Sequence, residues 1–160
     1  MASICKNQRE QVEEEVMGFN FSERVFQEFA DFMLGEFIDS GSSRTVYECL
    51  IKPEYVIKVE NSKHTFQNVK EWEFWQTWKH DKNARKWLAP CHFISDSGTF
   101  LIMERTEPLP KARVPQKVPK FMTDLKKSNF GLLNNKVVCH DYGHVVYQIN
   151  DDLGKWWGTQ

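Results

Sequence analysis

Three polar side chains near the end of the sequence have the types and the spacing that phosphoryl transfer requires. Asp124 and Asn129 lie in the segment TDLKKSN, and Asp141 follows a short apolar run and precedes Tyr142. A carboxylate can accept the proton of an attacking hydroxyl, and amide and carboxylate oxygens can bind a metal ion. The alternative is structural: Asp124 caps a helix or turn, Asn129 occupies a turn, and Asp141 caps a strand end.

A lysine and a glutamate upstream form a second candidate pair. Lys58 lies inside the apolar run YVIKVE, on the same strand face as Val56. Glu71 falls on the aromatic face of an expected helix over 65–80, whereas Glu73 falls on its polar face. Because a buried charge needs an opposite charge, the pattern favours a Lys58–Glu71 ion pair. The alternative for Lys58 is an edge-strand lysine that faces water.

A loop of small residues, Ser40-Gly41-Ser42-Ser43, is expected between two strands. The main-chain N–H groups of such a loop can contact phosphate. Small polar loops are also ordinary hairpin connections, so both interpretations stay open at this point.

The patterns of apolar residues, glycine and proline predict the elements that position these side chains. Helices are expected from Ser22 to Gly35, with a Phe stripe that packs on the next segment of the chain, and over 65–80. Strands and turns are expected over 36–60, including strands over 46–51 and 55–59, and further strands over 91–95, 99–104, 130–133 and 137–139. The last two flank an Asn134-Asn135 turn. Prolines within 108–119 predict an extended connector and a lobe boundary. A further strand is expected after His144, with Trp156 and Trp157 covering an edge.

Composition indicates one soluble domain. The chain has 160 residues, 41% of them hydrophobic, and a net charge of −1, so it can bury a core without disulfides. The four cysteines are scattered, no stretch resembles a signal peptide, and no apolar run reaches the ~18 residues of a membrane helix. We therefore expect reduced thiols, a cytoplasmic location and no membrane contact.

Zinc and nucleic acid are weaker candidates as ligands. The dipeptides Cys91-His92 and Cys139-His140 lie in expected strands, where neighbouring side chains point to opposite faces and cannot chelate together. Basic residues between Lys111 and Lys127 would attract anions. Only one aromatic residue is interleaved with them, and the overall charge is near neutral, so nucleic-acid binding is not favoured.

In their order, these parts resemble the protein kinase superfamily. A Gly-containing loop and VYE come first, YVIK is similar to the family's VAIK, FLIME to the strand before its hinge, DLKKSN to DLKPEN, and DYG to DFG. The resemblance implies an α+β, kinase-like fold with an antiparallel N-lobe sheet, one main helix and a much reduced C-lobe. It divides a single domain over 1–160 into a helical extension over 1–35, an N-lobe over 36–107 and a C-lobe part over 108–160.

The resemblance implies a nucleotide site that would hold ATP. Gly41 would lie over the phosphates, Val46 would roof the adenine, and Glu104 with the residues after it would form the hinge that binds the adenine edge. Lys58 would hold the α- and β-phosphates, and Glu71 would orient Lys58.

The resemblance also implies the groups that would carry out transfer. Asp124 would accept the proton of the attacking hydroxyl, and Lys126 would neutralise charge on the transferred group. Asn129 and Asp141 would hold Mg²⁺.

The sequence departs from the family pattern at several points. Asp39 and Arg44 stand where the family has its first and third loop glycines, so Arg44 is expected either to reach phosphate or to block it. Met122 and Thr123 replace the His-Arg ahead of the catalytic aspartate. About sixteen residues separate the hinge from Met122, and seventeen follow Gly143, which implies that a platform for a protein substrate is lacking.

Two functions are compatible with these residues. The first is a minimal kinase-like phosphotransferase that binds ATP and Mg²⁺, and the retention of all the charged groups favours it. The second is a degenerate kinase-like module, a pseudokinase, that docks on a partner protein and inhibits or regulates it. The departures favour the second, and such a trimmed form resembles the kinase-like proteins of small compact genomes such as those of viruses.

Overall fold

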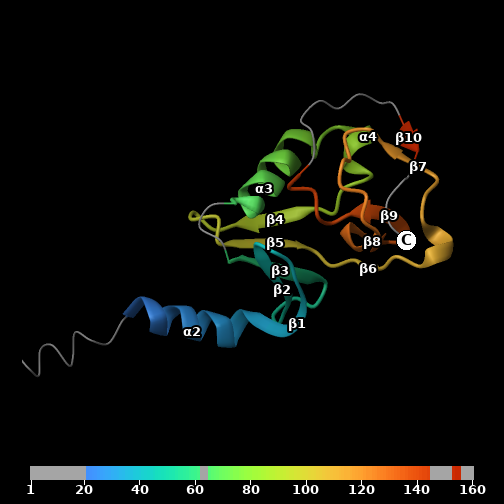
Figure 1. Cartoon of the computed structure of the whole chain (residues 1–160). Coiled ribbons are helices and arrows are strands. Elements are labelled where there is room, and N and C mark those ends of the chain that lie inside the picture. Colours follow the sequence, from blue (N-terminus) through green and yellow to red (C-terminus); the bar gives the residue numbers. More distant parts are fainter. Residues whose placement is uncertain (1–20, 62–64, 145–152, 156–160) are drawn as a thin grey trace, which may run out of the picture. The chain divides into compact units, whose positions relative to one another are not determined.

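The computed structural model describes residues 21–61, 65–144 and 153–155, and contacts within the chain separate residues 1–34 from residues 35–160 (Figure 1). In the first unit the described helix is α2 (Phe21–Met33), which contains an Arg24–Glu28 ion pair at helical spacing. Phe26 and Phe32 of α2 are 47% and 66% exposed, and the packing of the Phe stripe on the next segment of the chain stays a prediction.

The second unit is built on a five-stranded sheet in the order β1-β2-β3-β5-β4. The strands are β1 (Leu34–Ser40), β2 (Arg44–Cys49), β3 (Tyr55–Glu60), β4 (Cys91–Ile94) and β5 (Phe100–Glu104). The pairs β2–β3, β3–β5 and β4–β5 are antiparallel. Since β3 lies in the middle of the sheet, Lys58 is placed between Val46 and Leu101 of the neighbouring strands, and the edge-strand interpretation of this lysine is wrong.

One long helix, α3 (Gln67–Trp78), packs across β3, β4 and β5 (Figure 1). No side chain at its N-cap position caps the helix. The carboxylate of Glu60 accepts a hydrogen bond from the Asn68 N–H at 3.1 Å instead. The last residue of β3 therefore satisfies an N–H group in the first turn of the helix that packs against this strand. A short helix that the sequence did not suggest, α4 (Lys82–Arg85), comes next, and the Asp81 carboxylate caps it.

The remaining strands form two small sheets. The first has the order β6-β8-β9, with β6 (Glu107–Pro108), β8 (Phe130–Leu133) and β9 (Lys136–Cys139), and the second pairs β7 (Lys117–Pro119) with β10 (Leu153–Lys155). Two 3-10 turns, η1 (Lys111–Arg113) and η2 (Lys127–Asn129), lie between them in the chain. Asn134 and Asn135 have φ angles of 48° and 61°, which confirms the predicted turn between β8 and β9.

One hydrophobic core includes residues of α3, of the five-stranded sheet and of the small sheets. The ring of Phe74, on α3, lies 5.9 Å from the rings of both Phe121 and Tyr142, and all three side chains are buried. The second unit is therefore a mixed α+β structure with antiparallel sheets and few helices, as predicted. The strand expected over 145–149 and the edge-covering role of Trp156 and Trp157 lie outside the described residues. Within the described part of the chain, no helix is long and apolar enough to cross a membrane.

Candidate functional site

A cleft of about 1290 Å³ lies between the five-stranded sheet and the β6-β8-β9 sheet. Residues of β1, β2, β3 and β5 line one side, and residues of β6, η2, β8 and the segment after β9 line the other. Eight of the nine residues singled out in the sequence line it: Gly41, Val46, Lys58, Glu104, Asp124, Lys126, Asn129 and Asp141. The ninth, Glu71, is fully buried behind it on α3. The fold thus brings together side chains that are far apart in the sequence.

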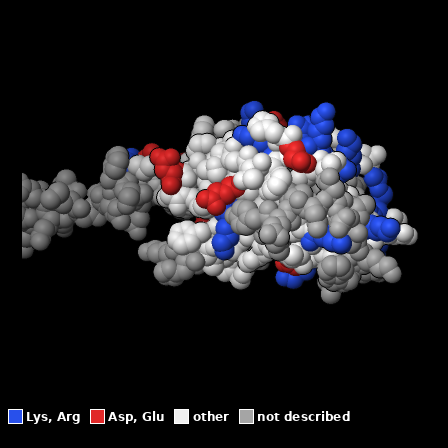
Figure 2. Space-filling model, turned by 90° about the horizontal axis from the view of Figure 1, so that it is seen from above, with Lys and Arg blue, Asp and Glu red and all other residues white. Residues whose placement is uncertain are grey.

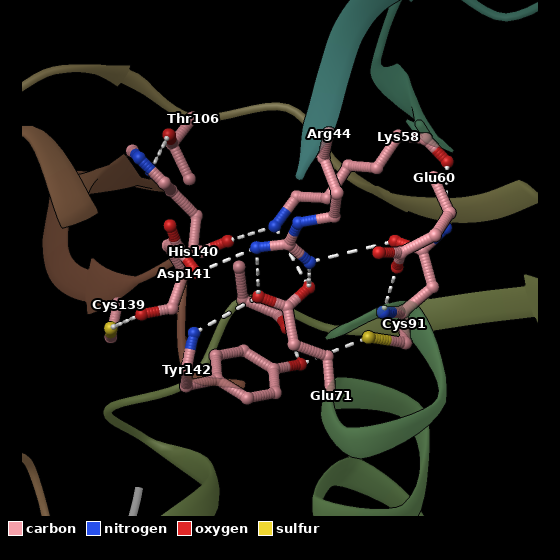
Figure 3. Close-up of polar contacts among 12 residues, drawn as sticks. Arg44, Lys58, Glu60, Glu71, Cys91, Thr106, Cys139, His140, Asp141 and Tyr142 are labelled. Atoms are coloured by element: carbon pink, nitrogen blue, oxygen red, sulfur yellow. Dashed lines mark hydrogen bonds and ion pairs between the residues drawn. The ribbon is translucent and has the colours of Figure 1, made fainter. Parts of the chain in front are cut away.

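The predicted Lys58–Glu71 ion pair is present. Lys58 Nζ lies 2.9 Å from Glu71 Oε2, and the two side chains are 5% and 0% exposed. Lys58 also donates a hydrogen bond to the carbonyl of His140, next to Asp141 (Figure 3). The Tyr142 N–H donates to Glu71 Oε1 at 3.1 Å. Glu71 therefore ties α3 both to β3 and to the Asp141-Tyr142-Gly143 segment.

Arg44, at the start of β2, occupies the middle of this charge cluster. Its guanidinium binds both oxygens of Glu71, with Nη1 2.8 Å from Oε2 and Nη2 3.0 Å from Oε1, and Nη2 also lies 2.6 Å from Asp141 Oδ1 (Figure 3). The Arg44 side chain is only 8% exposed. The sequence analysis expected Arg44 either to contact phosphate or to block the site, and both stay predictions. In the structure, Arg44 bridges the carboxylates of Glu71 and Asp141.

The electrostatics of the cluster result from burial and from these contacts. Burial would raise the pKa of Glu71, but Arg44 and Lys58 attract the charged form and lower it to about 2. The pKa of Asp141 is raised, first by burial and then by the neighbouring Glu71 carboxylate, although Lys58 and Arg44 oppose the shift. Glu71 is thus the firmly ionised member of the pair, and Asp141 is the carboxylate that depends on its cationic neighbours.

The Asp124 loop is held by two hydrogen bonds from Asn129 to main-chain carbonyls of the loop. Asn129 Nδ2 donates to the carbonyl of Asp124 at 3.2 Å, and the Asn129 N–H donates to the carbonyl of Lys126 at 3.0 Å. The Asp124 carboxylate is about one-third exposed and lies 3.4 Å from Lys126 Nζ, whose side chain is 66% exposed. The loop is therefore fixed while its carboxylate and lysine remain accessible to a ligand.

Two predicted residues contribute less specific features. A Cβ placed on Gly41 would meet no atom within 4 Å, so the space around this residue does not require glycine. The Glu104 carboxylate lies 3.3 Å from His92 Nε2, and the Glu104 N–H donates to the carbonyl of Pro90 at 2.9 Å.

His140 is a residue of the cleft that the sequence analysis considered only as a zinc ligand. Its Nε2 lies 2.8 Å from the carbonyl of Ser128 and its Nδ1 lies 2.7 Å from Thr106 Oγ1. Because a carbonyl can only accept, the proton is on Nε2, and Nδ1 accepts from the Thr106 hydroxyl. The ring therefore joins η2 to the segment after β5. Its position directly before Asp141 was the signal in the sequence.

Stability should fall between pH 7 and pH 5 because of His140. Burial, with a further contribution from Lys58, lowers the pKa of His140 from 6.5 to about 4. As the pH falls, the unfolded chain takes up the proton first, so the stabilisation is complete above pH 6.5 and is lost on the way to pH 4. We expect the free energy of unfolding, from urea titration, to be about 2 kcal/mol lower at pH 5 than at pH 7. The change should shrink strongly in His140→Gln, and an unchanged pH dependence in that variant would contradict the assignment.

The two residues predicted to hold Mg²⁺ are engaged in other contacts. Mg²⁺ needs oxygen ligands, for which Asn129 and Asp141 were the candidates. One oxygen of Asp141 is bound by Arg44, and the Asn129 amide supports its own loop. Among the described residues, no group of three or more His, Cys, Asp and Glu side chains is placed to hold a metal ion. In this arrangement the Asp141 carboxylate fits a guanidinium.

Basic side chains gather at the end of the second unit that carries α4 and β7, as Figure 2 shows. Exposed residues at these elements and in the loop after β7 include Lys82, Arg85, Lys117 and Lys120. Lys126 and Lys127 continue this charge into the wall of the cleft. Such a distribution raises the local concentration of anionic ligands.

Comparison with known proteins gives no match, either among models of protein families or among curated proteins. The function must therefore be argued from the cleft itself.

Proposed function

We propose that this chain is a minimal kinase-like protein whose cleft binds a nucleoside triphosphate such as ATP and positions it for in-line phosphoryl transfer. The observation that carries the proposal is the convergence of Lys58, Asp124, Lys126, Asn129 and Asp141 on one cleft. The order of these residues in the chain is one observation, and their position in the same cleft is a second one. Residues that only cap a turn or a strand would not need to share one cleft.

The walls of the cleft suit a nucleobase. Val46 and Val56 line it from the five-stranded sheet, and Leu109 and Leu132 line it from the other side. Two apolar walls can enclose a flat ring, and the main chain of the segment that follows β5 would bind the edge of the ring. The charged end of the cleft would then face the phosphates.

Each polar residue has a role in this proposal. Lys58 and the exposed side chain of Lys126 would bind phosphate oxygens, and Asp124 would accept the proton of the attacking hydroxyl. Asp141, which the sequence resemblance assigns to Mg²⁺, would lie beside the phosphates as an ion pair with Arg44, and Asn129 would support the Asp124 loop. The free cysteines Cys49, Cys91 and Cys139 accord with a reducing compartment, so we place the protein in the cytoplasm.

A second function is favoured by one contact. Because Arg44 binds Asp141 at 2.6 Å, the arrangement also suits a degenerate module that binds nucleotide or a partner protein without transfer. A partner could use exposed apolar residues near the sheet edge, such as Phe37 at 60%, Leu50 at 54% and Ile51 at 53% exposure. Nucleotide binding without any transfer would select this function.

Thermal unfolding with and without ATP tests the shared part of both proposals. ATP at about 100 times its Kd should stabilise the folded chain by about 2.7 kcal/mol and raise Tm by about 5–10 °C. The rise, measured from each variant's own baseline, should be lost in Lys58→Met and retained in Lys82→Met, an exposed lysine of α4 outside the cleft. If ATP leaves the Tm of the wild type unchanged, the nucleotide site is refuted.

A further inference from the structure

We infer that the Arg44 guanidinium takes the place of a divalent cation at Asp141, so that the cleft binds a nucleoside triphosphate without a metal ion. This inference rests on the proposed nucleotide site and specifies its cofactor requirement. The contact that points to it is the 2.6 Å ion pair between Arg44 Nη2 and Asp141 Oδ1, in the wall of the cleft.

Arg44 is held in this position before any ligand arrives. Both oxygens of Glu71 bind the guanidinium, and Asn68 Oδ1 lies 3.5 Å from its Nη1. Glu71 is itself fixed by Lys58 and by the Tyr142 N–H. The main chain of Arg44, at the start of β2, lies opposite Glu60 of β3 in the antiparallel sheet. A planar, bidentate guanidinium fixed at both ends loses little entropy when a ligand binds beside it.

The charges of the cluster are balanced without a metal. Two cations, Arg44 and Lys58, face two carboxylates, Glu71 and Asp141. A divalent ion at Asp141 would lie beside the guanidinium and would meet like-charge repulsion at close range. The same guanidinium neutralises Asp141, which would otherwise repel the phosphates of a nucleotide. One side chain therefore lowers the affinity for metal and removes the need for it.

The test compares ATP affinity, by calorimetry, in buffer with Mg²⁺ and in buffer with EDTA. Wild-type Kd values in the two buffers should agree. In Arg44→Gln the Asp141 carboxylate loses its cation, so ATP should bind about tenfold or more weakly in EDTA than in Mg²⁺. Arg44→Lys, which keeps the charge, should remain closer to the wild type than to Arg44→Gln.

A second measurement needs neither nucleotide nor activity. Mn²⁺ added to the ¹⁵N-labelled protein broadens amide signals near its binding site. The signals of Asp141, Tyr142 and Gly143 should stay sharp in the wild type and broaden in Arg44→Gln. Broadening of the same signals in the wild type would overturn the inference.

The outcomes separate this inference from the proposed function. If the wild type binds ATP only with Mg²⁺, Arg44 does not replace the metal, and the inference is wrong while the nucleotide site stands. If the wild type binds ATP in neither buffer, both are wrong. The wild-type measurements decide these cases by themselves, even if Arg44→Gln fails to fold.

Discussion

Glu71→Ala is expected to lower the free energy of unfolding by about 3–5 kcal/mol, because it leaves two buried cations without their shared carboxylate. Arg44 and Lys58 both bind Glu71, and the three side chains are at most 8% exposed. At about 2–4 °C per kcal/mol for a chain of this size, Tm should fall by about 6–20 °C. Urea titration and thermal scans would measure both quantities.

The loss should come from charge rather than from a cavity. Glu71→Gln keeps the size of the side chain and removes its charge, so it should cause most of the loss seen in Glu71→Ala. Glu73→Ala is the matched control, since Glu73 lies two positions away on the exposed face of α3, and its effect should stay within about 0.5 kcal/mol. Near-wild-type stability of Glu71→Gln would contradict the argument.

The same carboxylate shows how far the sequence could predict the site. Helical spacing placed Glu71, and not Glu73, on the inward face, and the alternation along YVIKVE placed Lys58 on the same strand face as Val56. Both inferences needed only local periodicity and the rule that buried charges are paired. The turn at Asn134-Asn135, with φ angles of 48° and 61°, was predictable from residue type, because asparagine tolerates left-handed conformations.

What could not be predicted depends on contacts between distant segments. The sequence identified Arg44 only as a residue that stands where the kinase family has a glycine. Its ion pair with Asp141 could not be predicted, because the two residues are 97 positions apart in the chain. The roles of His140 likewise depend on Thr106 and Ser128, which belong to other segments. Local patterns fix which side chains are buried, but tertiary packing decides which of them meet.

Asp124→Asn should reduce phosphoryl transfer by about 10²- to 10⁴-fold, the range expected for loss of a general base. The reason is chemical: an amide cannot take the proton of the attacking hydroxyl. The assay is release of labelled phosphate from γ-labelled ATP, together with label retained on the chain or on an added acceptor. Under the proposed function this is the largest effect on activity from a single substitution.

The structure allows this effect to be separated from misfolding. Asn129 binds the main-chain carbonyl of Asp124, which the substitution leaves intact. Among the described residues, the carboxylate has an exposed ion pair with Lys126 at 3.4 Å, and such pairs contribute at most about 1 kcal/mol. Asp124→Asn should therefore keep the Tm and the ATP affinity of the wild type. Asp96→Asn, in the turn between β4 and β5 and outside the cleft, should keep the rate as well.

Equal transfer rates in the wild type and Asp124→Asn would show that Asp124 is not the proton acceptor. Tight ATP binding with no transfer in either protein would instead favour the degenerate module, in which Arg44 holds Asp141 and the cleft serves recognition. Arg44→Gln distinguishes these two cases further. If removal of the guanidinium gives Mg²⁺-dependent transfer that still requires Asp124, then the acceptor loop is competent and Arg44 alone limits the reaction.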